Sequence, residues 1–344
     1  MCSTTRSGLP SRGVVPSVEQ GRDMRMARRV TISTFNFHYC PVEPGGNVED
    51  DVDRVAKYLE RKLAQVWPDR PDLVVLPECC DMPAGCAGEK LREYYRGRGD
   101  RILQVLASKA KEHHCYIAYP SIRLLGDGTW RNSVRLIDRG GNVVGTYDKN
   151  HPVLVEIEED GIRCGQDAPI MECDFGRVGC AICFDLNFDP LRTKYVNESP
   201  DLLLFPSMFH GGLMQQYWAY SCRSYFVGAI AGGLPATIVS PVGQIVRSSS
   251  SYFDYLSETV NLDYVVAHLD HNKPKLDAMR QKYGNKVKVT DPGHLGSVLI
   301  ASETDEFGAL DLIREFGIEP LDDYLARSLA GQRLDTNVQK NRKV

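Results

Sequence analysis

Three residues with catalytic potential each stand at the end of an apolar run, and their types suit cleavage of an acyl bond. Cys183 follows GRVGCAI, Glu78 ends DLVVLPE, and Lys149 ends GNVVGTYDK. A thiol can attack a carbonyl carbon, a carboxylate can carry the proton, and an ammonium can stabilise the resulting oxyanion. Singly, they have simpler interpretations as an inert core thiol, a solvated carboxylate and a surface amine. Together they predict a nucleophile, a base and an oxyanion clamp for amide hydrolysis.

The elements that must position these residues follow from the hydrophobic pattern, in which short apolar or β-branched runs mix with amphipathic ones. Strands are predicted at 30–37, 72–78, 115–122, 177–185, 201–207 and 259–270, hairpins within 133–149 and 235–247, and helices at 48–66, 89–112 and 212–227. Strand pairs mixed with helices predict an α/β fold in which two mixed sheets pack face to face. Helices then cover both outer faces, which gives a four-layer α-β-β-α sandwich.

The chain length of 344 residues fits one large domain with tails. We expect residues 1–28 to form a disordered or extended N-terminal tail and residues 29–300 to form the catalytic domain. Residues 301–344 are then a C-terminal extension that could pack on a neighbouring subunit.

The composition argues against several classes of protein. A formal charge of -4, from 41 basic and 45 acidic residues, gives no basic surface for nucleic acid or anionic membranes. The most apolar stretch, 226–246, is interrupted by glycine and proline, so we expect no membrane span there. The first 28 residues lack the apolar core of a signal peptide, and the 11 cysteines are scattered. These features predict a cytoplasmic protein with reduced thiols.

Three blocks in order, LVVLPE, YDKNHPVLVE and GRVGCAICFD, resemble those of the nitrilase superfamily of carbon–nitrogen hydrolases. The resemblance runs from about residue 30 to residue 270 and is closest to its amidase-like members. It implies a Glu78, Lys149 and Cys183 triad on an α-β-β-α sandwich. It also implies that Glu156 orients Lys149 or helps to place substrate, and that the backbone N–H of Phe184 shares the oxyanion with Lys149.

The same resemblance implies a reaction in which a small linear amide yields ammonia and a carboxylate through a cysteine thioester, without metal or organic cofactor. It further implies a homodimer or larger homo-oligomer. Cys183 is followed by Phe184 and Asp185 rather than the Cys-Trp-Glu usual in nitrile-cleaving members, which favours amides. Asp185, Asn187 and His210 are the predicted substrate-binding residues. An N-carbamoyl amino acid or ureido substrate, or a nitrile, remains an alternative.

Other classes of function have less support. Cys180 and Cys183 form a C-x-x-C, but redox pairs of this type normally open a helix, whereas these lie in a predicted strand. The other cysteines and His210 lack the paired spacing of a zinc site. A non-catalytic interaction subunit with the same fold, or the glutaminase half of an amidotransferase with a separate partner chain, stays open.

Overall fold

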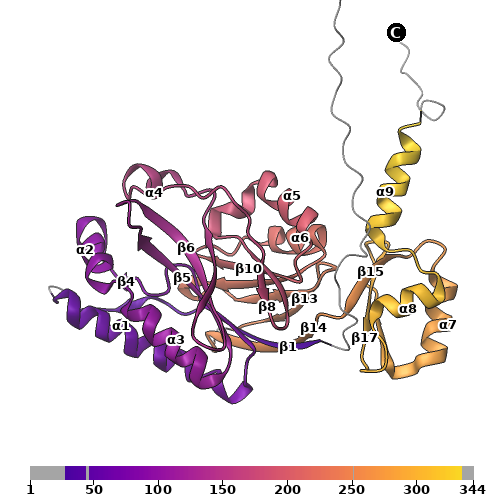
Figure 1. Ribbon diagram of the computed structural model, residues 1–344, viewed down its shortest axis with the longest axis horizontal. Coiled ribbons are helices and arrows are strands. Elements are labelled where there is room, and N and C mark those ends of the chain that lie inside the picture. The colour runs from indigo at the N-terminus through magenta and orange to yellow at the C-terminus, as the bar shows by residue number, and fades with distance from the viewer. Residues whose placement is uncertain (1–27, 44–45, 251, 335–344) are drawn as a thin grey trace, which may run out of the picture.

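The computed structural model describes residues 28–43, 46–250 and 252–334. The predicted N-terminal tail, apart from Arg28, and residues 335–344 lie outside this part of the chain. Two six-stranded mixed sheets pack face to face, and helices cover their outer faces, which confirms the predicted α-β-β-α sandwich (Figure 1).

The strands of the two sheets follow orders that place parallel strands at the centre of each sheet. The first sheet runs β14 (Tyr255–Asn261), β1 (Arg29–Phe35), β3 (Leu73–Val75), β5 (Tyr116–Leu124), β6 (Trp130–Ile137), β7 (Val143–Asp148). The second runs β13 (Ile245–Ser248), β12 (Thr237–Val239), β11 (Tyr225–Ile230), β10 (Leu202–Ser207), β9 (Gly176–Cys180), β8 (Met171–Cys173). Strands β1, β3 and β5 are parallel, as are β9, β10 and β11.

The alternation of side chains along β3 explains how one strand serves two layers. Leu73 and Val75 face the core between the sheets, whereas Val74 faces the helices outside the first sheet. Across the interface between the sheets, the Thr34 hydroxyl of β1 donates a hydrogen bond to the Gly228 carbonyl of β11 at 3.1 Å. Strand β3 is therefore buried on both faces.

Helices α1 (Val48–Leu63), α2 (Gly88–Arg98) and α3 (Arg101–His113) lie on the side of the first sheet. The Asn47 side chain caps α1 by accepting the Asp50 N–H at 2.8 Å, and the buried face of α1 repeats at helical spacing with Val52, Val55 and Leu59. The single helix predicted over 89–112 is wrong, because the chain turns at Gly99, where φ is 49°.

Helices α5 (Asp189–Glu198) and α6 (Leu213–Cys222) cover the second sheet. Trp218 of α6 contacts Phe226 of β11, with ring centroids 6.5 Å apart. The helix predicted over 212–227 stops at Cys222, because Arg223 takes a left-handed conformation and the following residues enter β11. Three further short elements belong to the sandwich: the helix α4 (Leu154–Glu158) and the paired strands β2 (Cys40–Pro41) and β4 (Pro83–Ala84).

A third, three-stranded sheet follows the sandwich, in a part of the predicted 29–300 domain for which no strand was predicted beyond residue 270. It has the order β15 (Tyr264–His268), β17 (Ser297–Ser302), β16 (Val287–Thr290), with helices α7 (Lys273–Tyr283), α8 (Ala309–Phe316) and α9 (Leu321–Gln332). The predicted last strand over 259–270 is in fact two strands, β14 and β15, in different sheets. The predicted boundary at residue 300 falls inside β17.

The third sheet has a small apolar core of its own, which α7 and α8 share. It is tied to the sandwich by an Arg29–Glu303 ion pair at 2.6 Å and by the Tyr264 hydroxyl, which donates to the Arg223 carbonyl at 2.6 Å. In Figure 1 this unit lies beside the sandwich, on the side away from α1 and α2. Within the described ranges, no helix has both the length and the apolar composition needed to cross a membrane.

Candidate active site

Glu78 lies three residues beyond β3, where Pro77 and the turn at Cys79 end the strand. Its side chain is only 1% exposed and is held through both oxygens. Oε1 accepts hydrogen bonds from Lys149 Nζ at 2.9 Å and Asn132 Nδ2 at 2.8 Å, and Oε2 accepts the Met208 N–H at 3.0 Å. Three donors stabilise the carboxylate and fix its orientation, so that Glu78 is a positioned acceptor for a proton.

Lys149 follows β7, and its ammonium lies between two carboxylates. Nζ is 2.9 Å from Glu78 Oε1 and 2.7 Å from Glu156 Oε2, and the side chain is 2% exposed. Burial alone would lower the pKa of Lys149, but the charges of Glu78 and Glu156 outweigh it and hold that pKa above its usual value. Lys149 is therefore a fixed positive charge, as its predicted role requires.

The backbone near Lys149 depends on a glycine. Gly165 donates its N–H to the Lys149 carbonyl at 2.8 Å. A Cβ at position 165 would lie 2.2 Å from the Asp148 carbonyl oxygen, so only glycine allows this approach. Glu156, in the first turn of α4, is held by the Val153 N–H at 2.8 Å. These contacts fix both ends of the Lys149–Glu156 pair.

Cys183 opens a 3-10 turn, η2 (Cys183–Asn187), three residues after β9. Its φ is 49°, in the left-handed region that a non-glycine residue enters at a cost of about 1–2 kcal/mol. Such outliers gather at active sites, where surrounding contacts hold them. The predicted oxyanion donor, the Phe184 N–H, belongs to the next residue of the same turn.

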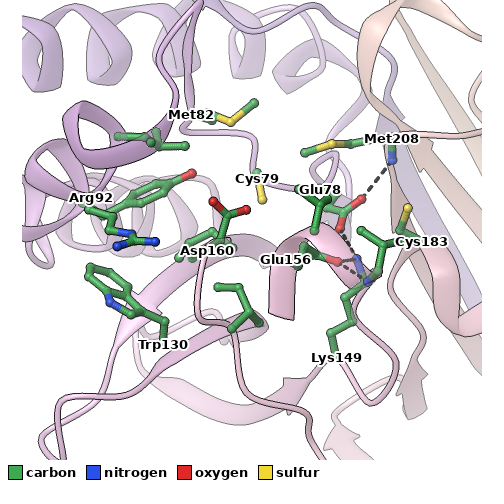
Figure 2. A pocket seen from close by; sticks show the side chains of 17 residues that line it. Glu78, Cys79, Met82, Arg92, Trp130, Lys149, Glu156, Asp160, Cys183 and Met208 are labelled. Carbon is green, nitrogen blue, oxygen red and sulfur yellow. Dashed lines mark hydrogen bonds and ion pairs between the residues drawn. The ribbon is translucent and has the colours of Figure 1, made fainter. Parts of the chain in front are cut away.

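The Cys183 thiol is not held as a thiolate in the resting site. Burial raises the pKa of Cys183 to about 12, the charge of Glu78 adds to the rise, and Lys149 opposes it. The resting thiol is therefore neutral near pH 7, and attack on a carbonyl needs a base that takes its proton. Glu78 is the carboxylate that the structure places against this thiol (Figure 2).

The protonation state of the Cys183 thiol can be measured by alkylation. Because the pKa of Cys183 is raised, the rate at which iodoacetamide modifies it should climb about tenfold per pH unit between about pH 7 and about pH 10. The rate is followed by mass spectrometry of the Cys183 peptide, with free cysteine as the reference, whose rate levels off above about pH 9. A rate for Cys183 that is already flat near neutral pH would show a resting thiolate and contradict the assignment.

Glu78, Lys149, Glu156 and Cys183 line one cavity of about 240 Å³. Figure 2 shows them on one side of it, with Arg92 across the cavity and Asp160 between. The rest of the lining is largely apolar: Met82, Leu91, Tyr95, Ile122, Trp130, Val155, Ile162. A mainly apolar cavity of this size with a few charged groups suits a small linear molecule.

The three predicted substrate-binding residues do not line this cavity. Asp185 is fully buried and accepts hydrogen bonds from the Tyr147 hydroxyl at 2.6 Å and the His151 N–H at 2.8 Å. It therefore ties the Cys183 turn to the segment around Lys149. Asn187 is exposed and donates to the Phe184 carbonyl, and His210 accepts the Gly212 N–H. These three residues are close in sequence to residues that line the cavity, but their own side chains do not enter it.

Asn132 was not predicted from the sequence, yet it connects the two carboxylates around Lys149. Its Nδ2 donates to Glu78 Oε1 at 2.8 Å and to Glu156 Oε1 at 2.9 Å. The signal was available: a hairpin centred on Gly140 and Gly141 places Asn132 opposite Lys149, where the Lys149 N–H donates to the Asn132 carbonyl at 2.8 Å. Arg92 and Asp160 gave no such signal, because they enter from α2 and the loop after α4.

The ten cysteines within the described residues are all free thiols. Cys180 is fully buried in β9, whereas Cys183 lines the cavity, so the two have different surroundings. No group of three or more His, Cys, Asp or Glu side chains with metal-binding geometry occurs in this part of the chain.

Comparisons with known proteins agree with this fold. The carbon–nitrogen hydrolase family model matches residues 43–269. Omega-amidase NIT2-A of Xenopus laevis is 25% identical over 261 residues, which cover 68% of this chain and 89% of that protein. Nit3 of Saccharomyces cerevisiae, a member of branch 10 of the nitrilase superfamily, superposes with a TM-score of 0.57 at 17% identity, over 75% of this chain and 95% of that one.

A third similar structure is a mutant of the amidase from Nesterenkonia sp. AN1. It has a TM-score of 0.56 at 15% identity and covers 73% of this chain and 94% of that one. In that protein, the acetamide moiety of fluoroacetamide is covalently added at the active-site cysteine.

A sandwich that brings a carboxylate, an ammonium and a thiol to one cavity defines a class of hydrolytic enzymes. The chain belongs to the carbon–nitrogen hydrolase family. Its amidase relatives support amide hydrolysis as the general reaction. The matched region ends at residue 269, so the third sheet beyond β15 and its helices lie outside it.

Proposed function

We propose that this chain is a cysteine-dependent amidase that hydrolyses the C–N bond of a small linear amide, with Cys183 as nucleophile. The observation that carries the proposal is the Lys149 ammonium, clamped between Glu78 and Glu156 in the cavity that Cys183 also lines. The covalent adduct at the active-site cysteine of the Nesterenkonia amidase supports the same role for Cys183.

The first half of the reaction forms a thioester. Glu78 accepts the thiol proton of Cys183 as Sγ bonds to the carbonyl carbon, and the negative charge passes to the carbonyl oxygen. Lys149 and the Phe184 N–H stabilise that oxygen. Glu78 then gives its proton to the amide nitrogen as the C–N bond breaks, so that ammonia leaves and the acyl group stays on Cys183.

The second half regenerates the thiol. Glu78 accepts a proton from a water molecule as the oxygen of that water bonds to the thioester carbon. The C–S bond then breaks, the proton returns to the Cys183 sulfur, and the carboxylate product leaves. Glu78 thus acts twice, first for the thiol and then for water, which explains why three donors hold it in one orientation.

A panel of substrates tests the proposal. Short aliphatic amides, ω-amides, N-carbamoyl amino acids and nitriles are assayed for ammonia with the wild-type protein and with Cys183→Ala. We expect release from at least one amide and none from the variant. Release only from an N-carbamoyl compound or a nitrile would replace the substrate class. Absence of any release would favour the non-catalytic alternative.

A further inference from the structure

The cavity is lined by two further charged residues, Asp160 and Arg92. Figure 2 shows Arg92 across the cavity from Lys149 and Cys183, with Asp160 between them. Lys149 is satisfied by Glu78 and Glu156. Asp160 and Arg92 differ from Lys149, because the protein supplies them with unequal sets of partners.

Arg92 is already engaged by the protein. One of its terminal nitrogens donates to the Glu159 carbonyl, and another lies 3.7 Å from Glu89 Oε2. Its Nε is buried and has no hydrogen-bond partner. The two terminal nitrogens of Arg92 thus have protein partners, and only the buried Nε is unpaired.

Asp160 has no such partners. Within the described ranges, no donor hydrogen-bonds to its carboxylate and no cation forms an ion pair with it. Burial raises the pKa of Asp160, Arg92 opposes the rise, and the charges of Glu156 and Glu159 add to it. A half-buried carboxylate that lines a cavity without a donor is incompletely satisfied, and a ligand can supply what the protein does not.

The charge of the cavity decides what kind of ligand fits. Its lining has three carboxylates (Glu78, Glu156, Asp160) and two cations (Lys149, Arg92). With all five ionised the excess is one negative charge, which attracts a cation and repels a carboxylate. The apolar side chains that make up the rest of the lining suit a methylene chain.

We propose that Asp160 binds a protonated amine at the far end of the substrate, so that the enzyme acts on ω-amino amides. The proposal rests on the proposed amidase function, because it assumes that the amide end of the substrate lies at Cys183. In the bound state, the ammonium donates to the Asp160 carboxylate while the methylene chain contacts Trp130 and Ile162.

Three amides of similar length test this specificity. δ-Aminovaleramide carries the amine, hexanamide replaces the ammonium with a methyl group, and glutaramate ends in a carboxylate. A hydrogen bond to a charged partner predicts a kcat/KM for δ-aminovaleramide about tenfold to a hundredfold above that for hexanamide. Glutaramate should be the poorest of the three. A wild-type preference for hexanamide or glutaramate would overturn the proposal.

Asp160→Asn keeps the size of the side chain and removes its charge. The ratio of the two kcat/KM values, δ-aminovaleramide over hexanamide, should fall to about one, and a general loss of activity cancels in this ratio. Glu158→Gln, which changes an exposed carboxylate on α4 outside the cavity lining, is the matched control and should keep the wild-type ratio. An unchanged ratio in Asp160→Asn would refute the role of Asp160.

Binding to Cys183→Ala separates this proposal from the proposed function. Calorimetry should show tighter binding of δ-aminovaleramide than of hexanamide, with the difference lost when Asp160→Asn is added. If no amide is hydrolysed but this difference is present, the amine site stands and the amidase mechanism fails. If amides are hydrolysed but the binding difference is absent, the amine site fails alone.

Discussion

Replacing Glu78 with glutamine should lower kcat/KM for the best amide by about a thousandfold or more, while the thiol of Cys183 becomes easier to alkylate. The activity falls because glutamine cannot accept the proton of the thiol or of the hydrolytic water. Alkylation rises because the charge of Glu78 contributes to the raised pKa of Cys183, and its removal lowers that pKa.

Opposite changes in the two rates distinguish a lost base from a damaged fold. Both are measured on the same Glu78→Gln sample, by ammonia release and by mass spectrometry of the Cys183 peptide after iodoacetamide treatment. Glu158→Gln, on the surface of α4, should leave both rates within about twofold of wild type. Near-wild-type hydrolysis in Glu78→Gln would remove Glu78 from the mechanism.

Replacing Lys149 with methionine should abolish measurable hydrolysis and also destabilise the protein by about 3–5 kcal/mol. The loss of activity follows from removal of the charge that stabilises the oxyanion. The loss of stability follows because Glu78 is 1% exposed and Glu156 is 14% exposed, so that both carboxylates lose a buried cation. Urea unfolding measures the stability, and ammonia release measures the activity.

A second variant separates these two consequences. Adding Glu156→Gln to Lys149→Met removes one stranded carboxylate and should recover part of the free energy of unfolding, but none of the activity. Lys109→Met, which removes a lysine from a partly exposed i,i+3 pair with Glu112, should cost less than about 1 kcal/mol. If Lys149→Met were as stable as Lys109→Met, the buried clamp described above would not exist in solution.

The sandwich and the positions of Glu78, Lys149 and Cys183 were predictable because each depends on a local pattern. Each of the three residues interrupts an apolar run at a strand end. Glu78 and Cys183 follow parallel central strands, and Lys149 follows the edge strand β7. Glu156 came from the resemblance to the superfamily, and the structure places it 2.7 Å from Lys149. The assembly state was also predicted, as a homo-oligomer, and that prediction stays open.

The lining of the cavity could not be predicted in the same way, because it depends on side-chain direction and on distant segments. Asp185 follows Cys183 by two residues, yet the 3-10 turn directs its carboxylate into the protein rather than into the cavity. Asp160 and Arg92 lie 68 residues apart in the sequence and line one cavity only in the folded protein. Neither residue interrupts an apolar strand, so no hydrophobic pattern in the sequence indicates that Asp160 or Arg92 lines a cavity.

The third sheet escaped prediction for a different reason. Its strands are short. In β16 (Val287–Thr290), a charged residue, Lys288, separates the two valines. Its core is small, and its apolar residues are separated by polar stretches that are typical of loops. The run TVNLDYVVAHLD at 259–270, in which apolar residues recur throughout, also concealed the break between β14 and β15, where the chain leaves one sheet for another.

The most direct test of the account is to identify the residue that carries the acyl group during turnover. Wild-type protein is mixed with p-nitrophenyl butyrate, quenched in acid during turnover, and mapped by peptide mass spectrometry. We predict one butyryl group on the peptide that contains Cys183 and none in Cys183→Ala. A butyryl group on another cysteine, or turnover that continues in Cys183→Ala, would contradict the assignment of Cys183 as nucleophile.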